Sequence, residues 1–341
     1  MPSAETPYSG TIFAIAPMMD WTDRHCRFLH RQLTRRALLY TEMVTADAVI
    51  HGDRDYLLGT GEVAGPQAVQ LGGSDPAKLA EAARIAEGYG YDEINLNVGC
   101  PSDRVQSGTF GACLMLRPRL VAQCVEAMAR AVAVPVTVKC RLGVDDQDTG
   151  PALDTLAADV WQAGAAALWV HARKAWLEGL SPKQNRDVPP LDYDRVRRLK
   201  RENPGRFIGL NGGLQNPDHA MAEMEGAVAG PDHVGLDGVM LGRAAYHDPG
   251  LLRDVDRLFH GDGQAPISWD ELVEMMIDYT ARHVTQGGRV HHVTRHMNGL
   301  FAGLPGARRW RRTLAEEGAR HEAGPQIIAA AYAAIGERQA A

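Results

Sequence analysis

The sequence predicts a (β/α)8 barrel followed by a smaller, all-helical C-terminal domain. Short apolar runs rich in β-forming residues recur eight times, at residues 12–17, 38–44, 66–71, 93–99, 134–140, 167–171, 206–211 and 238–242. Alanine-rich stretches with helical patterning separate several of these runs, at 76–88, 118–131 and 153–163. The runs start roughly 25 to 40 residues apart, too far for hairpins, so the strands run parallel with crossover helices. Eight such units are the number that closes a barrel.

An open, doubly wound sheet has the same alternation of strands and helices and is the alternative fold. Such sheets commonly bind a dinucleotide at a Gly-x-Gly-x-x-Gly turn after the first strand. No such turn follows residues 12–17. The barrel is therefore the favoured interpretation.

A glycine- and proline-rich stretch at 261–266 is typical of a linker between domains. No strand-like run follows it, whereas 270–284, 293–301 and 325–338 have helical periodicity, and Ser268 is placed to cap the first of these helices. We therefore expect a barrel domain over 1–262 and a helical domain over 263–341.

Composition limits the class of protein. A chain of 341 residues with 45% hydrophobic and 23% charged residues can bury a sizeable core. Five cysteines without a Cys-x-x-Cys pair argue against a disulfide framework and against a thiolate zinc site, and His291-His292 is the one close histidine pair, so we expect no metal. No leader-like amino terminus and no apolar stretch of about 18 residues occurs. A cytoplasmic protein without a membrane span is expected.

Positive charge is concentrated in one part of the chain. The net charge is −6, yet residues 279–315, here called the basic segment, contain no Asp, Glu or Lys and carry four histidines and seven arginines: Arg282, Arg289, Arg295, Arg308, Arg309, Arg311 and Arg312. Without those seven charges the rest of the chain would carry −13. Solvated helix faces usually mix both signs, so a segment of one sign favours a polyanionic partner over a merely solvated surface.

Polar residues recur at the carboxyl ends of the expected strands, where barrels of this class hold their chemistry. They are Pro17, Met18, Met19, Glu42, Gln70, Asn97, Cys100, Lys139, Arg141, His171, Arg173, Asn211, Gly212, Gly213, Gly242 and Arg243. In a closed barrel these scattered positions converge on one rim. The convergence is the reason to treat them as one site.

The last two strand ends indicate a phosphate site. Glycines 212, 213 and 242 let the backbone approach a ligand closely, and Arg243 adds a fork of donors. The loops after strands seven and eight are the usual place for a phosphate in such barrels. Plain turns are the alternative explanation of these glycines.

Lys139 stands in an otherwise apolar strand, where it is either a Schiff-base nucleophile or a cation that stabilises an anionic ligand. Gln70 offers the donor and the acceptor that a flat heteroaromatic edge requires. These two residues, His171 and the phosphate site together fit flavin mononucleotide (FMN). Lys139 would then favour the anionic reduced flavin.

Cys100 ends the fourth strand at a Gly-Cys-Pro turn. A cysteine at a strand end more often packs than reacts. Beside a flavin, however, a thiol that is protonated at neutral pH can donate the proton that accompanies hydride transfer to a C=C bond. The glycine-containing loop 102–109 is expected to form a lid, with Arg104 and Gln106 as candidate contacts.

Taken together, segments along nearly the whole chain resemble the tRNA-dihydrouridine synthases. They are Ala16-Pro17-Met18, Asp20-Trp21-Thr22-Asp23, Gln70-Leu71-Gly72-Gly73, Asn95-Leu96-Asn97-Val98-Gly99-Cys100-Pro101, Gly108-Thr109-Phe110-Gly111-Ala112, Val138-Lys139-Cys140-Arg141, Val170-His171-Ala172-Arg173, Asn211-Gly212-Gly213 and Gly242-Arg243. Segments 17–24 and 292–312 are most similar to the branch called DusA, which reduces uridines 20 and 20a of the tRNA D-loop. Asn298 departs from the pattern, which has an apolar residue there.

The resemblance implies an FMN-containing barrel with a helical tRNA-binding domain, which reduces the uridine C5–C6 bond with NADPH or NADH as the ultimate reductant. It implies Cys100 as the proton donor to C5, and FMN contacts from Pro17, Met18, Met19, Gln70, Lys139, His171, Asn211, Gly212, Gly213, Gly242 and Arg243. It implies tRNA contacts from Asn97, Lys183, Arg186, Arg308 and Arg311, and no obligate protein partner.

Three other interpretations compete with this one. A flavin barrel that reduces a free pyrimidine or a small enone would share the rim residues but would not need the basic segment. A lyase that uses Lys139 as a Schiff base would contain no flavin. A non-catalytic RNA-binding module would leave the rim residues without a purpose.

Overall fold

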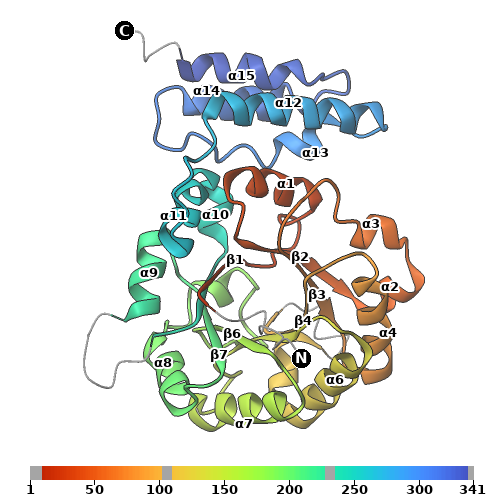
Figure 1. Ribbon diagram of the computed structural model, residues 1–341, viewed down its shortest axis with the longest axis vertical. Helices are drawn as coiled ribbons and strands as arrows, with labels where there is room; N and C mark the ends of the chain where they lie inside the picture. Colours follow the sequence, from red (N-terminus) through yellow and green to blue (C-terminus); the bar gives the residue numbers. More distant parts are fainter. Residues whose placement is uncertain (1–9, 102–109, 227–234, 337–341) are drawn as a thin grey trace.

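The computed structural model of the chain describes residues 10–101, 110–226 and 235–336. A barrel forms one part of the molecule, and helices α12 to α15 are stacked over one side of it (Figure 1). The loop 102–109, with the candidate lid residues Arg104 and Gln106, lies outside the described residues.

Eight parallel strands close a barrel in the order β1 to β8. They are β1 (Ile12–Ile15), β2 (Leu38–Thr45), β3 (Gln67–Gly72), β4 (Glu93–Val98), β5 (Val136–Arg141), β6 (Ala167–His171), β7 (Phe207–Asn211) and β8 (Gly238–Leu241). Closure occurs between the first and last strands, where Ile12 pairs with Gly238 and Ile15 with Leu241. The predicted barrel and its eight strands are confirmed.

Helices and helical turns connect the strands. They are α1 (Arg24–Leu33), α2 (Ala46–His51), α3 (Arg54–Leu58), α4 (Pro76–Glu87), η1 (Gly111–Leu116), α6 (Pro118–Ala131), α7 (Thr149–Gln162), η2 (Gln184–Arg186), α8 (Tyr193–Glu202), α9 (Pro217–Glu225), α10 (Arg243–His247), η3 (Pro249–Asp254) and α11 (Val255–His260). Helix α7 begins before residue 153 because the Asp148 side chain caps it by accepting from Gly150 N–H, and a first turn tolerates the Gly-Pro pair that follows.

The barrel interior is filled by side chains rather than by solvent. Trp169 is fully buried there and packs against Phe207, with ring centroids 5.5 Å apart. Gly209 faces this indole so closely that a Cβ atom would lie 2.1 Å from Trp169 Cε3. Glycine is thus required where β7 passes the largest interior side chain.

The region after the barrel is helical, as predicted: α12 (Trp269–Thr285), α13 (Val290–Thr294), α14 (Ala307–Glu316) and α15 (Gln326–Gly336). Ser268 forms a capping box with Glu271 at the start of α12. Gly261 ends α11 in a left-handed conformation, with φ of 62°, at the start of the expected linker. No helix in the described ranges is long and apolar enough to cross a membrane.

The expected helix over 293–301 is wrong. Helix α13 ends at Thr294, and turns follow it. A Cβ atom on Gly299 would lie 2.3 Å from the carbonyl oxygen of His247, so this turn packs directly on the barrel backbone. Trp310 of α14, a helix not predicted, donates its indole N–H to Met297 O at 2.9 Å and fixes the turn from the other side.

Candidate functional site

The carboxyl ends of the strands bring the expected site residues onto one rim. Lys139 on β5 donates from Nζ to Asn211 Oδ1 on β7 at 3.0 Å. A Cβ atom on Gly212 would lie 2.6 Å from the His171 ring. One on Gly242 would lie 3.6 Å from Met18 Sδ, so the residues after β8 and β1 are neighbours too.

A chain of amides crosses the barrel interior below this rim. Gln70 Nε2 donates to Asn95 Oδ1 at 2.8 Å, and Asn97 Nδ2 donates to Gln70 Oε1 at 2.7 Å. The Gln70 side chain is 1% exposed, so its orientation is fixed by these two neighbours. An amide has two N–H groups and two lone pairs, and one of each is still available for a flat ligand on the rim.

Asn97 holds the backbone that carries Cys100. Its Oδ1 accepts from Gly99 N–H at 3.1 Å and from Cys100 N–H at 3.0 Å, while its Nδ2 is used by Gln70. Ala112 N–H donates to Cys100 O at 2.9 Å. Both lone pairs of Asn97 Oδ1 are therefore used, and the side chain positions the backbone of the cysteine.

Arg141 is a rim residue to which the sequence assigned no role, and the structure shows what it contacts. It is 3% exposed, and its Nε donates to Gly99 O at 2.9 Å. Its Nη1 donates to the carbonyls of Lys174 and Asn185 at 3.0 and 2.9 Å. The guanidinium thus ties the Cys100 turn to the loop after β6, and backbone carbonyls carry no signal in the sequence that could reveal this.

Burial changes the ionisation of the rim. It lowers the pKa of Lys139 to about 8, an effect strengthened by Arg141 and opposed by Cys100. Burial, with the nearby charges of Arg141 and Lys139, also holds the pKa of His171 well below 6.5. His171 is therefore a neutral imidazole at pH 7. Lys139 is a cation at that pH and loses its proton when the pH rises above about 8.

The rim residues fit a bound flavin with a phosphate. His171 Nε2 is buried and has no hydrogen-bond partner among the described residues, which leaves a polar atom for a ligand. Gly212 and Gly213 have φ of 108° and 68°, and a Cβ on Gly213 would lie 2.4 Å from Leu191. Arg243 donates to Asp187 at 2.7 Å, and both side chains are partly exposed, so a phosphate could replace this weak pair.

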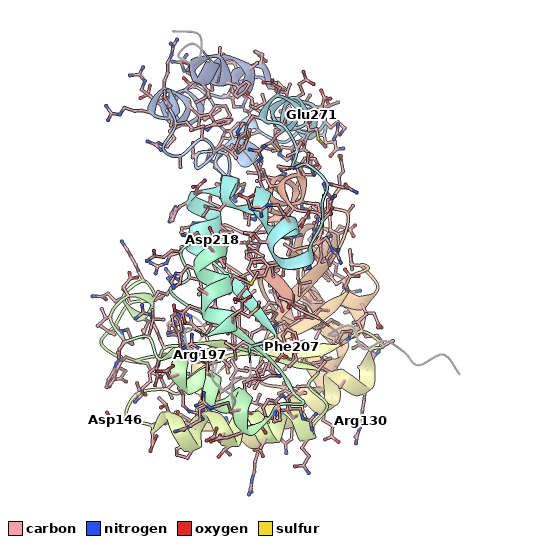
Figure 2. The ribbon with its side chains drawn as sticks, turned by 60° about the vertical axis from the view of Figure 1, so that its left-hand side comes forward. Arg130, Asp146, Arg197, Phe207, Asp218 and Glu271 are labelled. Atoms are coloured by element: carbon pink, nitrogen blue, oxygen red, sulfur yellow. The ribbon has the colours of Figure 1, made fainter. Side chains whose placement is uncertain are left out.

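The residues expected to contact RNA do not all lie together. Lys183 and Arg186 are exposed in the loop beyond β6, near the rim. Arg308 and Arg311 are exposed on α14 in the helical region, on either side of the buried Trp310. Figure 2 shows that charged side chains also project from the outer helices of the barrel, Arg130 of α6 among them.

The basic segment is partly neutralised by the barrel. Arg282 Nη2 lies 2.6 Å from Glu62 Oε2, and Arg295 pairs with Asp23. These two arginines join the helical region to the barrel. The exposed arginines of α14 carry the positive charge that faces outward. The positive surface is therefore smaller than the basic segment of the sequence indicated.

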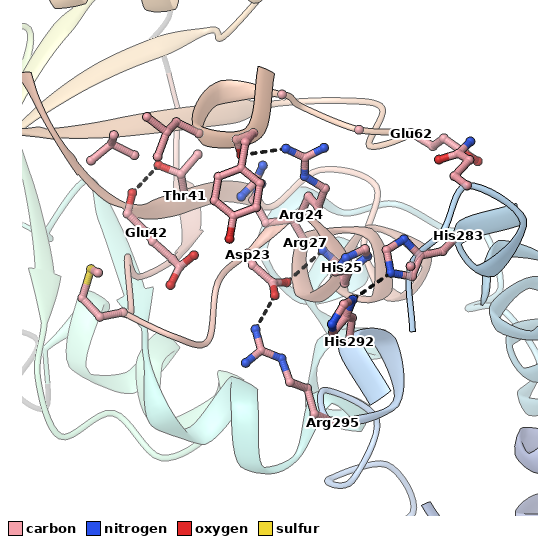
Figure 3. Close-up of a pocket in the computed structure, with 18 of the residues that line it drawn as sticks. Asp23, Arg24, His25, Arg27, Thr41, Glu42, Glu62, His283, His292 and Arg295 are labelled. Carbon is pink, nitrogen blue, oxygen red and sulfur yellow. Dashed lines mark hydrogen bonds and ion pairs between the residues drawn. The ribbon is translucent and has the colours of Figure 1, made fainter. Parts of the chain in front are cut away.

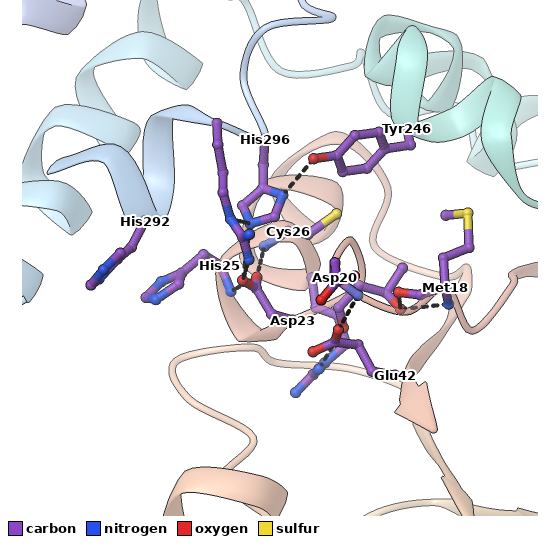
Figure 4. Close-up of polar contacts among 12 residues, drawn as sticks. Met18, Asp20, Asp23, His25, Cys26, Glu42, Tyr246, His292 and His296 are labelled. Carbon is purple, nitrogen blue, oxygen red and sulfur yellow. Dashed lines mark hydrogen bonds and ion pairs between the residues drawn. The ribbon is translucent and has the colours of Figure 1, made fainter. Parts of the chain in front are cut away.

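Asp23 is the centre of a junction between the two parts (Figure 4). It caps α1 by accepting from the N–H groups of His25 and Cys26, both at 2.9 Å. Its Oδ2 also lies 3.0 Å from His296 Nε2, and His296 Nδ1 lies 3.2 Å from the Tyr246 hydroxyl. Burial would raise the pKa of Asp23, but the hydrogen bond and charge of His296 hold it well below 3.8.

A cavity of about 950 Å³ lies beside this junction. Its barrel side is formed by α1, the end of β2 and α3, and its other side by α12 and α13 (Figure 3). Met19, one of the expected FMN contacts, lines it and is 54% exposed. This cavity could not be predicted from the sequence, because its two walls come from segments more than 200 residues apart.

Polar and ionisable side chains gathered at the carboxyl ends of eight parallel strands are the arrangement of a barrel enzyme. The sequence profile of the dihydrouridine synthase (Dus) family matches residues 14–335. The chain belongs to the dihydrouridine synthase family.

Proteins named tRNA-dihydrouridine(20/20a) synthase are close relatives. The one from Shewanella oneidensis is 51% identical over 323 residues, which cover 95% of this chain and 93% of the relative. Those from Escherichia coli strain K12 and Yersinia pestis are 52% and 49% identical and cover 92% and 98% of this chain and 88% and 94% of the relatives. The family resemblance is confirmed, and membership decides against the lyase, the small-molecule reductase and the non-catalytic module.

Proposed function

We propose that this enzyme reduces uridines 20 and 20a in the D-loop of tRNA to 5,6-dihydrouridine, with FMN as cofactor and NADPH or NADH as reductant. The observation that carries the proposal is the arrangement of Asn97, Gly99 and Cys100, which holds the backbone of Cys100 at the end of β4, next to the strand that carries the buried Lys139. The two positions rest on the names of relatives that are about half identical over nearly the whole chain.

We assign the cofactor site to the rim. FMN, when bound and reduced, supplies the hydride for uridine C6. Gly212, Gly213, Gly242 and Arg243 would hold its phosphate. Its ring would contact the remaining rim residues: Pro17, Met18, Met19, Gln70, Lys139, His171 and Asn211.

Cys100 completes the reaction as general acid. Its Sγ–H donates the proton to C5 on the face of the base opposite the hydride donor, and the proton is replaced from solvent after turnover. A uridine in folded tRNA is stacked or paired, so it must leave the stack to reach the barrel. Lys183, Arg186, Arg308 and Arg311 would hold the RNA, mainly through its phosphates. We place the reaction in the cytoplasm. Five cysteines without a Cys-x-x-Cys pair fit that reducing compartment.

The test uses an unmodified tRNA transcript, the FMN-loaded enzyme and NADPH. Mass spectrometry of nuclease fragments should show the gain of two hydrogens at uridines 20 and 20a and at no other uridine. Reduction at other positions would overturn the assignment of positions while leaving the family's reaction in place. Absence of any reduction would overturn the proposed function.

A further inference from the structure

The cavity beside the Asp23 junction has the size of a ligand site, since such sites usually occupy about 300 to 1,000 Å³. It reaches the barrel rim at Met19 and at residues 41–45 of β2. The helical region contributes Tyr279, His283 and His292 to its far wall. A group bound there would lie next to whatever occupies the barrel mouth.

The charges in the cavity do not suit a phosphate. Three arginines line it, and each is already engaged. Arg24 Nη2 donates to the carbonyls of Asp55 and Tyr56, both at 2.7 Å. Arg27 donates to Thr22 O at 2.9 Å, and Arg295 pairs with Asp23.

Carboxylates add to this effect. Glu42 and Glu62 both line the cavity, Glu62 being paired with Arg282. Asp23 lines the cavity as well, so an anion that entered it would meet occupied cations and three carboxylates. The walls favour an uncharged, polar occupant.

Three imidazoles supply flat surfaces for such an occupant. The ring centroids of His25 and His283 are 4.4 Å apart, and those of His283 and His292 are 5.4 Å apart. Burial lowers the pKa of His25 to about 3 and that of His283 and His292 below 6.5. The three rings are thus neutral at pH 7, and the described residues hold no group that could bind a metal ion.

Their hydrogen bonds fix the tautomers. His292 Nδ1 lies 3.3 Å from Arg289 N–H, which can only donate, so this nitrogen accepts and the proton of His292 is on Nε2. His283 Nε2, 3.1 Å from the same Nδ1, must then be the donor. His283 Nδ1 is left as an acceptor and His292 Nε2 as a donor, at opposite ends of this bonded pair of rings.

We propose that this cavity holds the base of the nucleotide next to the reacting uridine, stacked on the His283 ring, beside which the His25 and His292 rings pack at an angle. The inference rests on the proposed function. Uridines 20 and 20a are adjacent, so when one enters the barrel mouth the other must be placed close by. A cavity that adjoins the mouth and is lined by neutral, flat rings fits that second base.

The chain offers two ways to perturb the cavity. His283→Ala removes the central ring. Gly288→Ala displaces it, because a Cβ atom there would lie 2.1 Å from His283 Nε2, and the imidazole is the part that can move. His321→Ala is the matched control, since His321 is exposed in the helical region and does not line the cavity.

The experiment is a double-mutant cycle between protein and RNA. One tRNA transcript has uracil at 20 and 20a, and a second has uracil at 20 and no base at 20a. For each enzyme the dissociation constant and the single-turnover rate at uridine 20 are measured. Removing the base should weaken binding to the wild type roughly tenfold, as expected for one stacked base. His283→Ala and Gly288→Ala should weaken binding of the intact tRNA by a similar factor and show no further loss with the abasic tRNA.

The outcomes separate the two proposals. Two results would show that the cavity does not hold this base, provided that the wild type reduces uridine 20. In the first, the fold-losses of tRNA affinity from the protein change and from the missing base multiply. In the second, His283→Ala binds the intact tRNA as tightly as the wild type. If the wild type reduces no uridine, the proposed function itself fails. His321→Ala should behave as the wild type with both transcripts, and NADPH-driven reduction of bound flavin should be unchanged in all variants.

Discussion

His296 Nε2 lies 3.0 Å from Asp23 Oδ2, and this contact joins the helical region to the first helix of the barrel across 273 residues of sequence. His296 is 2% exposed, so this contact is shielded from solvent. The same carboxylate caps α1 and binds Arg295. One side chain therefore sets the start of α1 and the position of the helices above it.

Asp23→Asn should lower the free energy of unfolding by about 2 kcal/mol at pH 7, because asparagine still caps the helix but loses charged hydrogen bonds. The pKa of Asp23 is held below 3.8 in the folded state. Its stabilising effect is therefore complete above about pH 4 and is lost as the pH falls through the folded value. Urea unfolding should show a smaller difference between the two proteins at pH 3 than at pH 7. An equal difference at both pH values would contradict this account.

Cys100→Ala should retain affinity for FMN and tRNA and lose most turnover. The thiol is the proposed proton donor, and general acids usually contribute a factor of about 100 to 10,000. Single-turnover assays with NADPH-reduced enzyme and unmodified tRNA measure the effect. Unchanged turnover would remove Cys100 from the mechanism.

Asn97→Ala separates positioning of Cys100 from direct contact with RNA. Loss of the bonds to the N–H groups of Gly99 and Cys100 should lower the rate of reduction by about 100-fold, because misplacing a reacting group by about 1 Å has such an effect. The dissociation constant for tRNA should remain close to that of the wild type. A weaker tRNA complex that reacts at the normal rate would show that Asn97 acts through the RNA.

Lys139→Met should weaken FMN binding by at least about tenfold, as loss of a charged hydrogen bond does. The wild-type affinity should fall as the pH rises above about 8, because Lys139 then loses its proton, whereas the affinity of the variant should not follow this transition. Quenching of flavin fluorescence on binding to apoprotein measures both effects. Lys78→Met, at an exposed site on α4, is the control. A variant that keeps the same pH profile would exclude Lys139 as the titrating group.

Replacing both Arg308 and Arg311 by Ala should weaken tRNA binding and flatten its salt dependence. Each lost phosphate contact should reduce the slope of log affinity against log salt by about 0.7 to 0.9. Arg130→Ala on α6 is the matched control, since its side chain is 78% exposed and lies on the outer barrel surface. NADPH oxidation should be normal in both proteins. An unchanged slope for the double variant would show that α14 does not contact the RNA.

The barrel could be predicted because its signals are local. Strands such as β5 and β6 are apolar runs bounded by turn residues, and Asp75-Pro76 and Ser268 begin helices by capping rules that need no knowledge of the rest of the chain. The rim followed from topology, since strand ends in a closed barrel must meet. Residues from distant strands, such as Lys139 and Asn211, could thus be grouped before any distance was known.

The remaining features depend on contacts between distant segments. Helix α14 buries Ala307, Trp310 and Leu314, whose spacing is helical, but four arginines stand among them, and only the charge of this segment entered the prediction. The turn after α13 packs directly on the backbone of His247, and only a glycine at position 299 leaves room for this contact. Arg141 binds three backbone carbonyl groups, which have no sequence signal. The cavity forms between two walls that are far apart in the sequence.

The visible absorption spectrum of the purified protein tests the central claim most directly. A yellow protein should lose its colour when NADPH is added under anaerobic conditions and regain it when unmodified tRNA is added, because electrons pass from NADPH through the flavin to uridine. Transcripts in which uridines 20 and 20a are replaced by cytidine should not restore the colour. A colourless protein that takes up no added FMN, or a bleached protein that unmodified tRNA cannot reoxidise, would contradict the account.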